Sequence, residues 1–339
     1  MTGFDPRDAS GVAERLRRWA AARFAGEVAV VGSPAAVGMG FDSYIHLVRL
    51  AGATLPAEWA APLVVRLLPS ADRVEQAHRE AGVQAWCASH GYPAPHVLAV
   101  LDPGDVFDLP AQVMDLAPGV TGLVALKARP WRVRALVHQL AGLQLQLHAM
   151  DVAGWPGPTA ADALVTQRLG LPRRVAAETG DDALAGALRQ VESLLPVASA
   201  GPAVVCHGDF HPLNVMVDGA SASVIDWTDA GLGPREADVA RTLLLFRVAS
   251  IAATGSLERT ALRLIGPGLA TAYRRAYERG ATLDSARMRA WEALHALHGW
   301  SQVVMLHSGG FAGASSADAG SVPAALGPWL RARFDAAIG

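Results

Sequence analysis

The sequence predicts an α+β fold of two lobes, a small β-rich N-terminal lobe with a helix and a larger, mainly helical C-terminal lobe. The chain has 339 residues, more than one hydrophobic core usually organises. Short β-rich runs dominate up to the Pro118-Gly119 pair, and apolar residues recur at helical spacing after it. We therefore expect an N-terminal lobe over 1–118, a hinge at about 112–119 and a C-terminal lobe over 119–339.

The N-terminal lobe is expected to hold one sheet and two helices. The helices are an amphipathic segment over 11–25 and a segment over 72–90 that ends before Gly91 and Pro93. Five β-rich runs are predicted to supply the strands: 28–31, 44–50, 63–68, 97–101 and 111–116. A glycine-containing segment, 37–43, separates the first two runs and is expected to form a turn.

The C-terminal lobe is expected to be helical around one β-rich island. Leucines at helical spacing predict a helix over 136–147, and a second helix is predicted over 286–308. The island spans 204–227, with Asp218-Gly219 as the tight turn of a hairpin. The segment 309–321, rich in Gly, Ala and Ser, is expected to be a loop.

The composition excludes several classes of protein. A net charge of −2 argues against nucleic acid as a partner. No stretch reaches the roughly 20 apolar residues that a membrane span needs. The first 26 residues carry five arginines, four of them at Arg15, Arg17, Arg18 and Arg23, where a signal peptide needs an apolar centre. Cys87 and Cys206 are the only cysteines and lie in apolar runs, so free buried thiols are expected. We predict a cytoplasmic protein, a monomer or weak dimer, without membrane or nucleic-acid partners.

Charge is distributed unevenly between the two predicted lobes. Residues 1–118 hold 9 basic and 13 acidic side chains, and the remainder holds 20 and 18. Lys127 is the only lysine, against 28 arginines. A role usually filled by lysine at a nucleotide must therefore fall elsewhere or to arginine.

The most informative stretch runs from Cys206 to Trp227. It contains H-x-D-x-x-x-x-N, with Asp209 and Asn214, and a second aspartate, Asp226, twelve residues after the asparagine. Phosphoryl transfer needs an oxygen acceptor beside the attacking hydroxyl and hard oxygen ligands for Mg²⁺. These three residues supply both requirements in one ordered set.

This pair of segments, HGDFHPLN followed by VIDW, resembles the aminoglycoside phosphotransferase and choline kinase family, a branch of the protein-kinase-like fold. The resemblance implies that Asp209 is the catalytic base and that Asn214 and Asp226 bind Mg²⁺. It also implies ATP or GTP as co-substrate and a small hydroxylated molecule as acceptor. Trp227 departs from the D-F-G segment of protein kinases.

The segment before the second β-rich run holds Gly38, Gly40 and Ser43. Its backbone N–H groups are suited to approach phosphates, although two glycines in a hairpin turn are commonly only a turn. Its position ahead of Arg66 and Glu80 resembles the nucleotide loop of the family. We assign the three residues to cofactor binding on that basis.

Arg66 lies in the middle of a predicted strand, where a charge among apolar neighbours needs a partner. Glu80 and Glu75 lie on the same predicted helix, and the resemblance favours Glu80. The pair would direct a cation at the α and β phosphates, as the strand lysine of kinases does.

The segment 112–119 resembles the hinge strand of the family. This resemblance implies that Met114 is the gatekeeper and that backbone groups, including those of Leu116, contact a purine. A buried edge strand is the alternative interpretation.

Several other polar residues have structural roles or roles that the sequence leaves open. We expect His207 to brace the loop, while His211 is balanced between a loop residue and a role near the phosphates. Asp238 is assigned a structural role at the start of a buried helix, where it could also act as an N-terminal cap. One helical face suggests a metal site, but a plain helix face is the favoured interpretation: Glu292, His295 and His298.

Three functions fit these features. The first is a kinase of an antibiotic or other natural product, of the aminoglycoside- or macrolide-phosphotransferase type. The second is a metabolic alcohol kinase, for choline, a sugar or homoserine. A nucleotide-binding pseudokinase is disfavoured because the base and both metal ligands are present. The basic balance of the C-terminal part favours acceptors less charged than aminoglycosides, although Asp229 and Glu236 could neutralise local positive charge.

Overall fold

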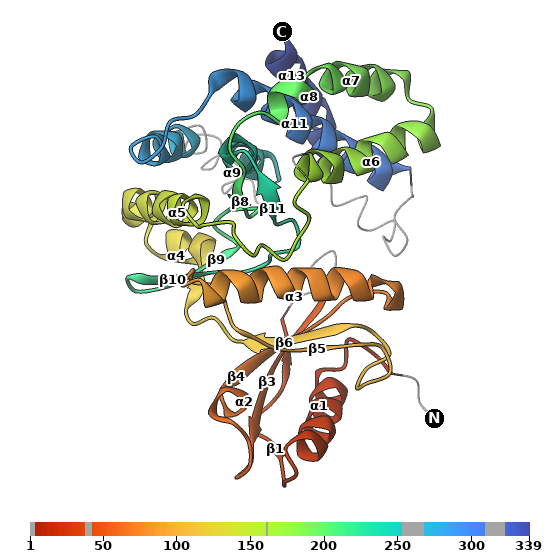
Figure 1. Ribbon diagram of the computed structural model, residues 1–339, viewed down its shortest axis with the longest axis vertical. Helices are drawn as coiled ribbons and strands as arrows, with labels where there is room; N and C mark the ends of the chain where they lie inside the picture. The colour runs from red at the N-terminus through yellow and green to blue at the C-terminus, as the bar shows by residue number, and fades with distance from the viewer. Residues whose placement is uncertain (1–3, 38–42, 161, 253–267, 309–322) are drawn as a thin grey trace. The chain divides into compact units, whose positions relative to one another are not determined.

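The computed structural model describes residues 4–37, 43–160, 162–252, 268–308 and 323–339 (Figure 1). Two compact units form. Unit 1 contains Met1–Val120 and Met216–Thr228, and unit 2 contains Thr121–Val215 and Asp229–Gly339. The segment Met216–Thr228 belongs to unit 1, whereas the sequence predicts it in the C-terminal lobe. Gly38, Gly40 and the predicted loop over 309–321 lie outside the described residues.

Unit 1 is built on a six-stranded antiparallel sheet in the order β1-β3-β4-β6-β5, with β2 paired to β3. Its five predicted strands are confirmed to within one or two residues, and the short β2 is additional. The strands are β1 (Ala29–Val30), β2 (Ala35–Ala36), β3 (Tyr44–Ala51), β4 (Pro62–Leu67), β5 (Val97–Leu101) and β6 (Ala111–Asp115). In this register Arg66 of β4 lies opposite Gln112 of β6.

One face of this sheet packs against α1 (Ala9–Arg23). The helix starts at its N-cap Asp8, whose side chain accepts the N–H of Ser10 at 3.0 Å. Val12 and Leu16 are fully buried and belong to the core formed with alternate residues of β4. Burial of each such side chain contributes about 1.5–3 kcal/mol. The alternation leaves Arg66 on the other face of β4.

That other face is where α3 (Val74–Ser89) supplies Glu80, which pairs with Arg66. A 3₁₀ turn, η1 (Ala71–Arg73), precedes α3, and the helical turn α2 (Ala57–Ala60) connects β3 to β4. The predicted helix over 72–90 is thus confirmed with its first turn tightened. The two faces of one strand separate an apolar core from a polar cluster.

A three-stranded sheet, β10-β9-β7, marks the return of the chain. Its strands are β7 (Val120–Thr121), β9 (Val215–Asp218) and β10 (Ser221–Val224). The hairpin turn is formed by Gly219 and Ala220, one residue later than predicted, because Asp218 still belongs to β9 and Gly219 takes the positive φ of 62°. Gly119 has φ 91°, and a Cβ there would lie 2.1 Å from the Val217 carbonyl oxygen, so this crossing requires glycine.

Unit 2 is mainly helical, as predicted. Its elements are α4 (Gly122–Ala128), η2 (Pro130–Arg132), α5 (Val133–His148), α6 (Ala163–Thr179), α7 (Asp182–Ser193), α8 (Leu195–Ala198), α9 (Arg235–Ala252), α11 (Ser285–His307) and α13 (Leu326–Ile338), with further helical residues at 268–277. α11 is buried along most of its length and packs against α6, α9 and α13 (Figure 1). It organises the core of the unit.

A two-stranded sheet within unit 2 carries the loop of interest. β8 (Val204–Cys206) pairs antiparallel with β11 (Gly231–Gly233), and Cys206 lies opposite Gly231. Both cysteines are free and buried, as predicted, and burial raises the pKa of Cys87 to about 12. Among the described residues, every helix is too short or too polar to cross a lipid bilayer.

Candidate active site

The loop after β8 turns sharply at Gly208. Its φ of 78° is in the left-handed region, and a Cβ would lie 2.2 Å from the carbonyl oxygen of Asp229. The Gly208 carbonyl oxygen accepts a hydrogen bond from Arg168 Nη2 at 2.6 Å. Glycine is therefore required for the backbone to pass between these groups and present Asp209.

Asp238 anchors the same turn from α9. Its Oδ1 accepts the N–H of Gly208 at 2.7 Å, and its Oδ2 accepts the N–H of His207 at 3.1 Å. Gln144 Nε2 and His148 Nε2 also lie 3.0 and 3.1 Å from Oδ2. Burial disfavours the charge on this carboxylate, but these donors outweigh burial and lower its pKa to about 2. Asp238 is inside the first turn of α9 and is not its cap, so its role is to hold the loop.

Both oxygens of the Asp209 carboxylate are occupied by donors within unit 2. Oδ1 accepts from Arg241 Nε at 3.2 Å and Nη2 at 3.0 Å. Oδ2 lies 3.1 Å from His211 Nε2 and 3.3 Å from Asn214 Nδ2. A carboxylate offers about four acceptor positions, so these donors fill all of them.

This environment keeps Asp209 ionised. Burial opposes the charged form, but the hydrogen bond from His211 and the positive charge of Arg241 outweigh burial and hold the pKa of the carboxyl well below its ordinary value. At neutral pH the carboxyl group is therefore ionised and acts only as a hydrogen-bond acceptor.

Two histidines fix the loop around this carboxylate. His207 is fully buried, and its Nδ1 accepts the N–H of Asp209 at 3.3 Å, a contact that fits the predicted bracing role. The N–H of Leu213 donates to His211 Nδ1 at 3.2 Å. Because Nδ1 accepts, the neutral ring carries its proton on Nε2 and donates it to Asp209.

Asn214 and Asp226 each present an oxygen suited to a hard cation. The Nδ2 of Asn214 donates to the Asp209 carbonyl oxygen at 3.0 Å, and its Oδ1 accepts no hydrogen bond from any residue that the structure describes. In unit 1, Asp226 is exposed and adopts φ 64°, and its Oδ1 accepts from Thr228 Oγ1 at 2.7 Å. Each residue by itself offers an oxygen of the kind that Mg²⁺ takes, a carboxylate in unit 1 and an amide in unit 2.

Arg66 is the centre of a polar cluster in unit 1. Its Nη1 donates to Glu80 Oε2 at 2.6 Å and lies 3.4 Å from Gln112 Oε1. Its Nε donates to Ser43 Oγ at 3.2 Å, and its Nη2 donates to Thr228 Oγ1 at 3.0 Å. The predicted choice of Glu80 as partner is confirmed; Glu75 lies exposed on α3. One N–H of Nη2 has no partner in the described part of the chain.

Thr228 connects this cluster to the candidate metal ligand. Its hydroxyl accepts from Arg66 and donates to Asp226. Ser43, predicted in the phosphate loop, is buried beside Arg66. The structure thus joins three predicted residues, Ser43, Arg66 and Asp226, through a threonine that the sequence analysis did not single out.

The hinge residues are placed less favourably for a purine. Met114 is buried, and its Sδ lies 3.5 Å from Gln84 Nε2. The N–H of Leu116 already donates to the carbonyl oxygen of Pro62 at 3.0 Å. The N–H group of Leu116 therefore cannot bond a base without giving up this contact.

The acids considered for charge neutralisation are committed to arginines. Asp229 Oδ2 lies 2.9 Å from Arg168 Nη1, and Glu236 Oε2 lies 3.2 Å from Arg287 Nε. The expectation that these two acids could neutralise a cationic acceptor is therefore not supported.

The helical face with two histidines does not form a metal site in the described ranges. His295 Nε2 bonds the Ala237 carbonyl oxygen, and His298 Nδ1 bonds that of Arg168. Burial and the charge of Arg168 lower the pKa of His298 to about 4. Glu292 pairs with Arg247. All three side chains therefore have hydrogen-bond or ion-pair partners within unit 2.

Sequence reasoning missed Arg241, Thr228 and Arg168. Arg241 follows Asp238 by three residues in one helix, a spacing that places both on one side of it. Thr228 follows Asp226 by two residues. These two spacings in the sequence could have indicated Arg241 and Thr228. The contact of Arg168 with Gly208 could not be predicted in this way, because it depends on the packing of α6.

Residues 53–300 match the model of the phosphotransferase enzyme family. The match covers most of the chain, and the chain belongs to this family. The predicted class of enzyme, a phosphotransferase with an alcohol group as acceptor, is confirmed at the level of the family. No curated protein gave a significant match.

Solved structures show the same fold at low identity. A thermostable mutant of aminoglycoside phosphotransferase APH(4)-Ia, in ternary complex with AMP-PNP and hygromycin B, is 17% identical with a TM-score of 0.63 over 96% of this chain and 98% of that chain. An aminoglycoside-3'-phosphotransferase of type VIII is 22% identical, with a TM-score of 0.56 over 85% and 99%. Macrolide 2'-phosphotransferase MphH from Brachybacterium faecium is 21% identical, with a TM-score of 0.56 over 91% and 98%. The predicted two-lobed fold is confirmed.

Proposed function

We propose that this phosphotransferase moves the γ-phosphoryl group of ATP or GTP to a hydroxyl of an antibiotic or similar natural product, with Asp209 as the base. The observation that carries the proposal is the Asp209 carboxylate, which is held by Arg241, His211 and Asn214 and kept ionised. A nucleotide is supported by the solved complex of APH(4)-Ia with AMP-PNP. The proposal includes a cytoplasmic location and a monomer or weak dimer.

In this mechanism the acceptor hydroxyl donates its hydrogen bond to Asp209. Because four donors already fill the carboxylate, the hydroxyl replaces one of them, and the longest contact, to Asn214 Nδ2 at 3.3 Å, is the easiest to give up. As the new O–P bond forms and the bond to the nucleoside diphosphate breaks, Asp209 takes the hydroxyl proton. The proton then passes to solvent when the product leaves.

Asn214 and Asp226 would hold Mg²⁺ through their free side-chain oxygens. When bound, the ion supplies charge neutralisation on the transferring phosphates. Arg66 contributes the remaining positive charge from β4. It keeps one N–H available and is held in place by Ser43, Glu80 and Thr228.

The pairing of the nearby acidic side chains favours an acceptor less charged than an aminoglycoside. Asp229 and Glu236 are each paired with an arginine, so neither offers free negative charge to a polyamine. Hygromycin B is the molecule bound by APH(4)-Ia, and a macrolide is named for MphH. We place this chain nearer the second type. A metabolic alcohol such as choline or a sugar is the alternative acceptor.

The test is acceptor-dependent consumption of ATP and GTP across macrolides, aminoglycosides, nucleoside antibiotics, choline and sugars, with and without Mg²⁺. The proposal predicts one class of hydroxylated acceptor whose phosphorylated product forms only with Mg²⁺. Asn214→Ala and Asp226→Ala should each lose activity at low Mg²⁺. Nucleotide binding without turnover on any member of the panel would contradict it.

A further inference from the structure

Residues 127–134 form a continuous exposed surface on unit 2, where α4 ends, η2 turns and α5 begins. Seven of these eight side chains are exposed, and α4 and η2 pack against α5 on their other side (Figure 1). Trp131 is 76% exposed, although an indole is usually buried. Pro130 opens η2, and its restricted φ stiffens the turn directly before the indole. An ordered turn therefore presents Trp131 to solvent.

Two more large apolar side chains are exposed at α4. Val124 of this helix is 50% exposed, and Leu213 is 49% exposed in the loop after β8. The N–H of Leu123 donates to the Pro212 carbonyl oxygen at 3.1 Å, which brings that loop to the first turn of α4. Apolar exposure is therefore concentrated at α4 and the two segments that contact it within unit 2.

Positive charge surrounds Trp131 without compensating acids. Arg129 and Arg132 lie on either side of it in the sequence, and Arg134 follows. All three are exposed, and their guanidinium groups form no ion pair or hydrogen bond with any residue that the structure describes. The sequence holds no Asp or Glu over 116–150. The charge of this surface is therefore available to an anionic partner.

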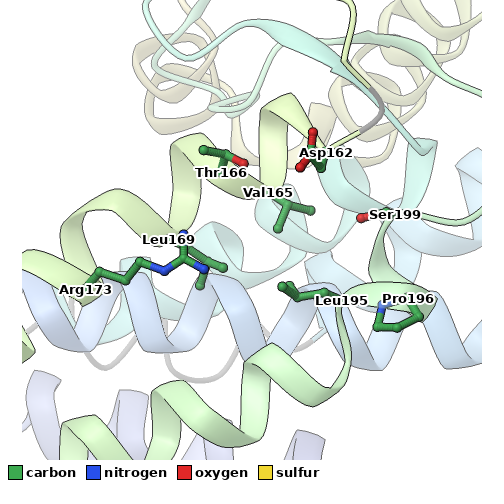
Figure 2. Close-up of a pocket in the computed structure, with 8 residues that line it drawn as sticks. All are labelled: Asp162, Val165, Thr166, Leu169, Arg173, Leu195, Pro196 and Ser199. Carbon is green, nitrogen blue, oxygen red and sulfur yellow. The ribbon is translucent and has the colours of Figure 1, made fainter.

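A second partly exposed apolar area of unit 2 lacks such charge. It surrounds the cavity between α6 and α8, which is lined by Leu195, Arg173 and Asp162 (Figure 2). There the arginine forms an ion pair with Glu192 at 3.0 Å, and the lining already includes an acid. The unpaired arginines, and not apolar exposure alone, therefore distinguish the surface over 127–134.

An anionic lipid layer fits this combination of groups. Tryptophan favours the interface between membrane and water, and arginine binds phosphate oxygens with two parallel hydrogen bonds. Adsorption strengthens with buried apolar area and with attraction to anionic lipids. A continuous exposed run can meet a flat layer without a matching groove on the partner. The expectation of no membrane partner rested on the lack of a stretch able to span a bilayer, and adsorption requires none.

We propose that the surface over 127–134 docks unit 2 on a membrane surface rich in anionic lipids. Trp131 enters the headgroup region, and the three arginines pair with lipid phosphates. The binding is peripheral, and salt weakens it because salt screens its electrostatic part. It depends neither on the nucleotide nor on the acceptor of the proposed function.

The test is co-sedimentation of the full chain with two kinds of vesicle, one of phosphatidylcholine alone and one of phosphatidylcholine and phosphatidylglycerol in equal parts. The wild type should bind the anionic vesicles about a hundredfold more tightly, because each arginine near such a surface contributes about fivefold. The triple variant Arg129→Gln/Arg132→Gln/Arg134→Gln should lose this preference. High salt should weaken binding of the wild type to the anionic vesicles.

A matched triple variant separates this surface from the net charge of the protein. Arg49→Gln/Arg79→Gln/Arg189→Gln removes the same charge from exposed arginines of β3, α3 and α7. It should bind the anionic vesicles as the wild type does. Equal losses of affinity in the two triple variants, or equal affinity of the wild type for the two kinds of vesicle, would overturn the proposal.

Single variants test the apolar contribution. Trp131→Gln should weaken binding to the anionic vesicles about tenfold, and Val124→Gln about threefold, in proportion to the apolar area that each side chain would bury. Val197→Gln, which replaces an exposed valine of α8, should have no effect. All these side chains are exposed, so the Tm of each variant should match that of the wild type. Unchanged binding by Trp131→Gln would contradict insertion of the indole.

Soluble polyglutamate tests the competing partner, an acidic protein. The proposal predicts that polyglutamate binds much more weakly than the anionic vesicles, because it offers no interface for Trp131. Binding to polyglutamate as tight as to the vesicles, and lost in the variant of Arg129, Arg132 and Arg134, would overturn the assignment to lipid and indicate an acidic protein.

Discussion

Arg241 holds one oxygen of the Asp209 carboxylate with two nitrogens, Nε at 3.2 Å and Nη2 at 3.0 Å. The contact comes from the buried helix α9, three residues after Asp238, which holds the backbone of the same loop. One helix therefore fixes both the main chain and the side chain of the proposed base. The acceptor hydroxyl is therefore expected to meet the second oxygen, where it would replace the contact from Asn214 Nδ2 at 3.3 Å.

Arg241→Ala should lower kcat about a hundredfold while leaving the nucleotide KM nearly unchanged. The carboxylate would lose the contact that orients it, and misplacement of a reacting group by about 1 Å costs on that order. Arg241→Lys should recover part of the loss. Steady-state kinetics check both values, with Arg247→Ala on the same helix, paired with Glu292, as the control. A change confined to KM would argue against positioning.

Glu80→Gln should raise the nucleotide KM and lower the free energy of unfolding by about 3 kcal/mol. The side chain is 2% exposed, and its removal as a charge leaves Arg66 without its closest partner. Urea unfolding and kinetics at varied ATP measure the two effects. Glu75→Gln, on the same helix but exposed, should change neither. Equal effects of Glu80→Gln and Glu75→Gln would show that the Arg66–Glu80 ion pair contributes neither to stability nor to nucleotide binding.

Asp238 gives a pH dependence whose sign follows from its pKa of about 2, below the ordinary value of 3.8. A pKa depressed in the folded state stabilises the protein above pH 3.8, and this stabilisation is lost as the pH falls toward 2. The pKa shift corresponds to a contribution on the order of 2 kcal/mol to the free energy of unfolding. The free energy of unfolding, measured in urea, should therefore be higher for the wild type than for Asp238→Asn, and this difference should become smaller below pH 4. A gap independent of pH would contradict this account.

Gly208→Ala should abolish turnover and destabilise the fold more than Gly91→Ala does. Both glycines have φ 78°, so both substitutions carry the left-handed penalty of about 1–2 kcal/mol. At Gly208 the new Cβ would also lie 2.2 Å from the Asp229 carbonyl oxygen, whereas at Gly91 nothing lies within 4 Å. The free energy of unfolding and the rate of product formation are measured for both variants. An equal loss of unfolding free energy in both would mean that the contact of the new Cβ with the Asp229 carbonyl oxygen has no effect.

Much of the fold was predictable because its signals are local. The apolar run around Arg66 predicted β4, and the charge within that run predicted a partner on α3. Asp218 and Gly219 predicted the hairpin within one residue. The boundary of the units was harder, because the return of Met216–Thr228 to unit 1 depends on pairing between β9 and β7, far apart in sequence.

The site was predictable where the chemistry lies in one motif, and not where it depends on packing. Asp209, Asn214 and Asp226 stand in an ordered spacing that phosphoryl transfer needs. Arg241 reaches Asp209 only because α9 packs against β8. Asp238 was expected as a possible cap, yet its four donors come from the loop after β8 and from α5.

The most direct test is formation of phosphorylated acceptor by the wild type and by Asp209→Asn, with ATP binding measured on both proteins. The account predicts that Asp209→Asn binds ATP as the wild type does but forms product at least about a hundredfold more slowly, the contribution expected of a general base. Product formation at the wild-type rate by Asp209→Asn, with ATP binding unchanged, would contradict the assignment of Asp209 as the base.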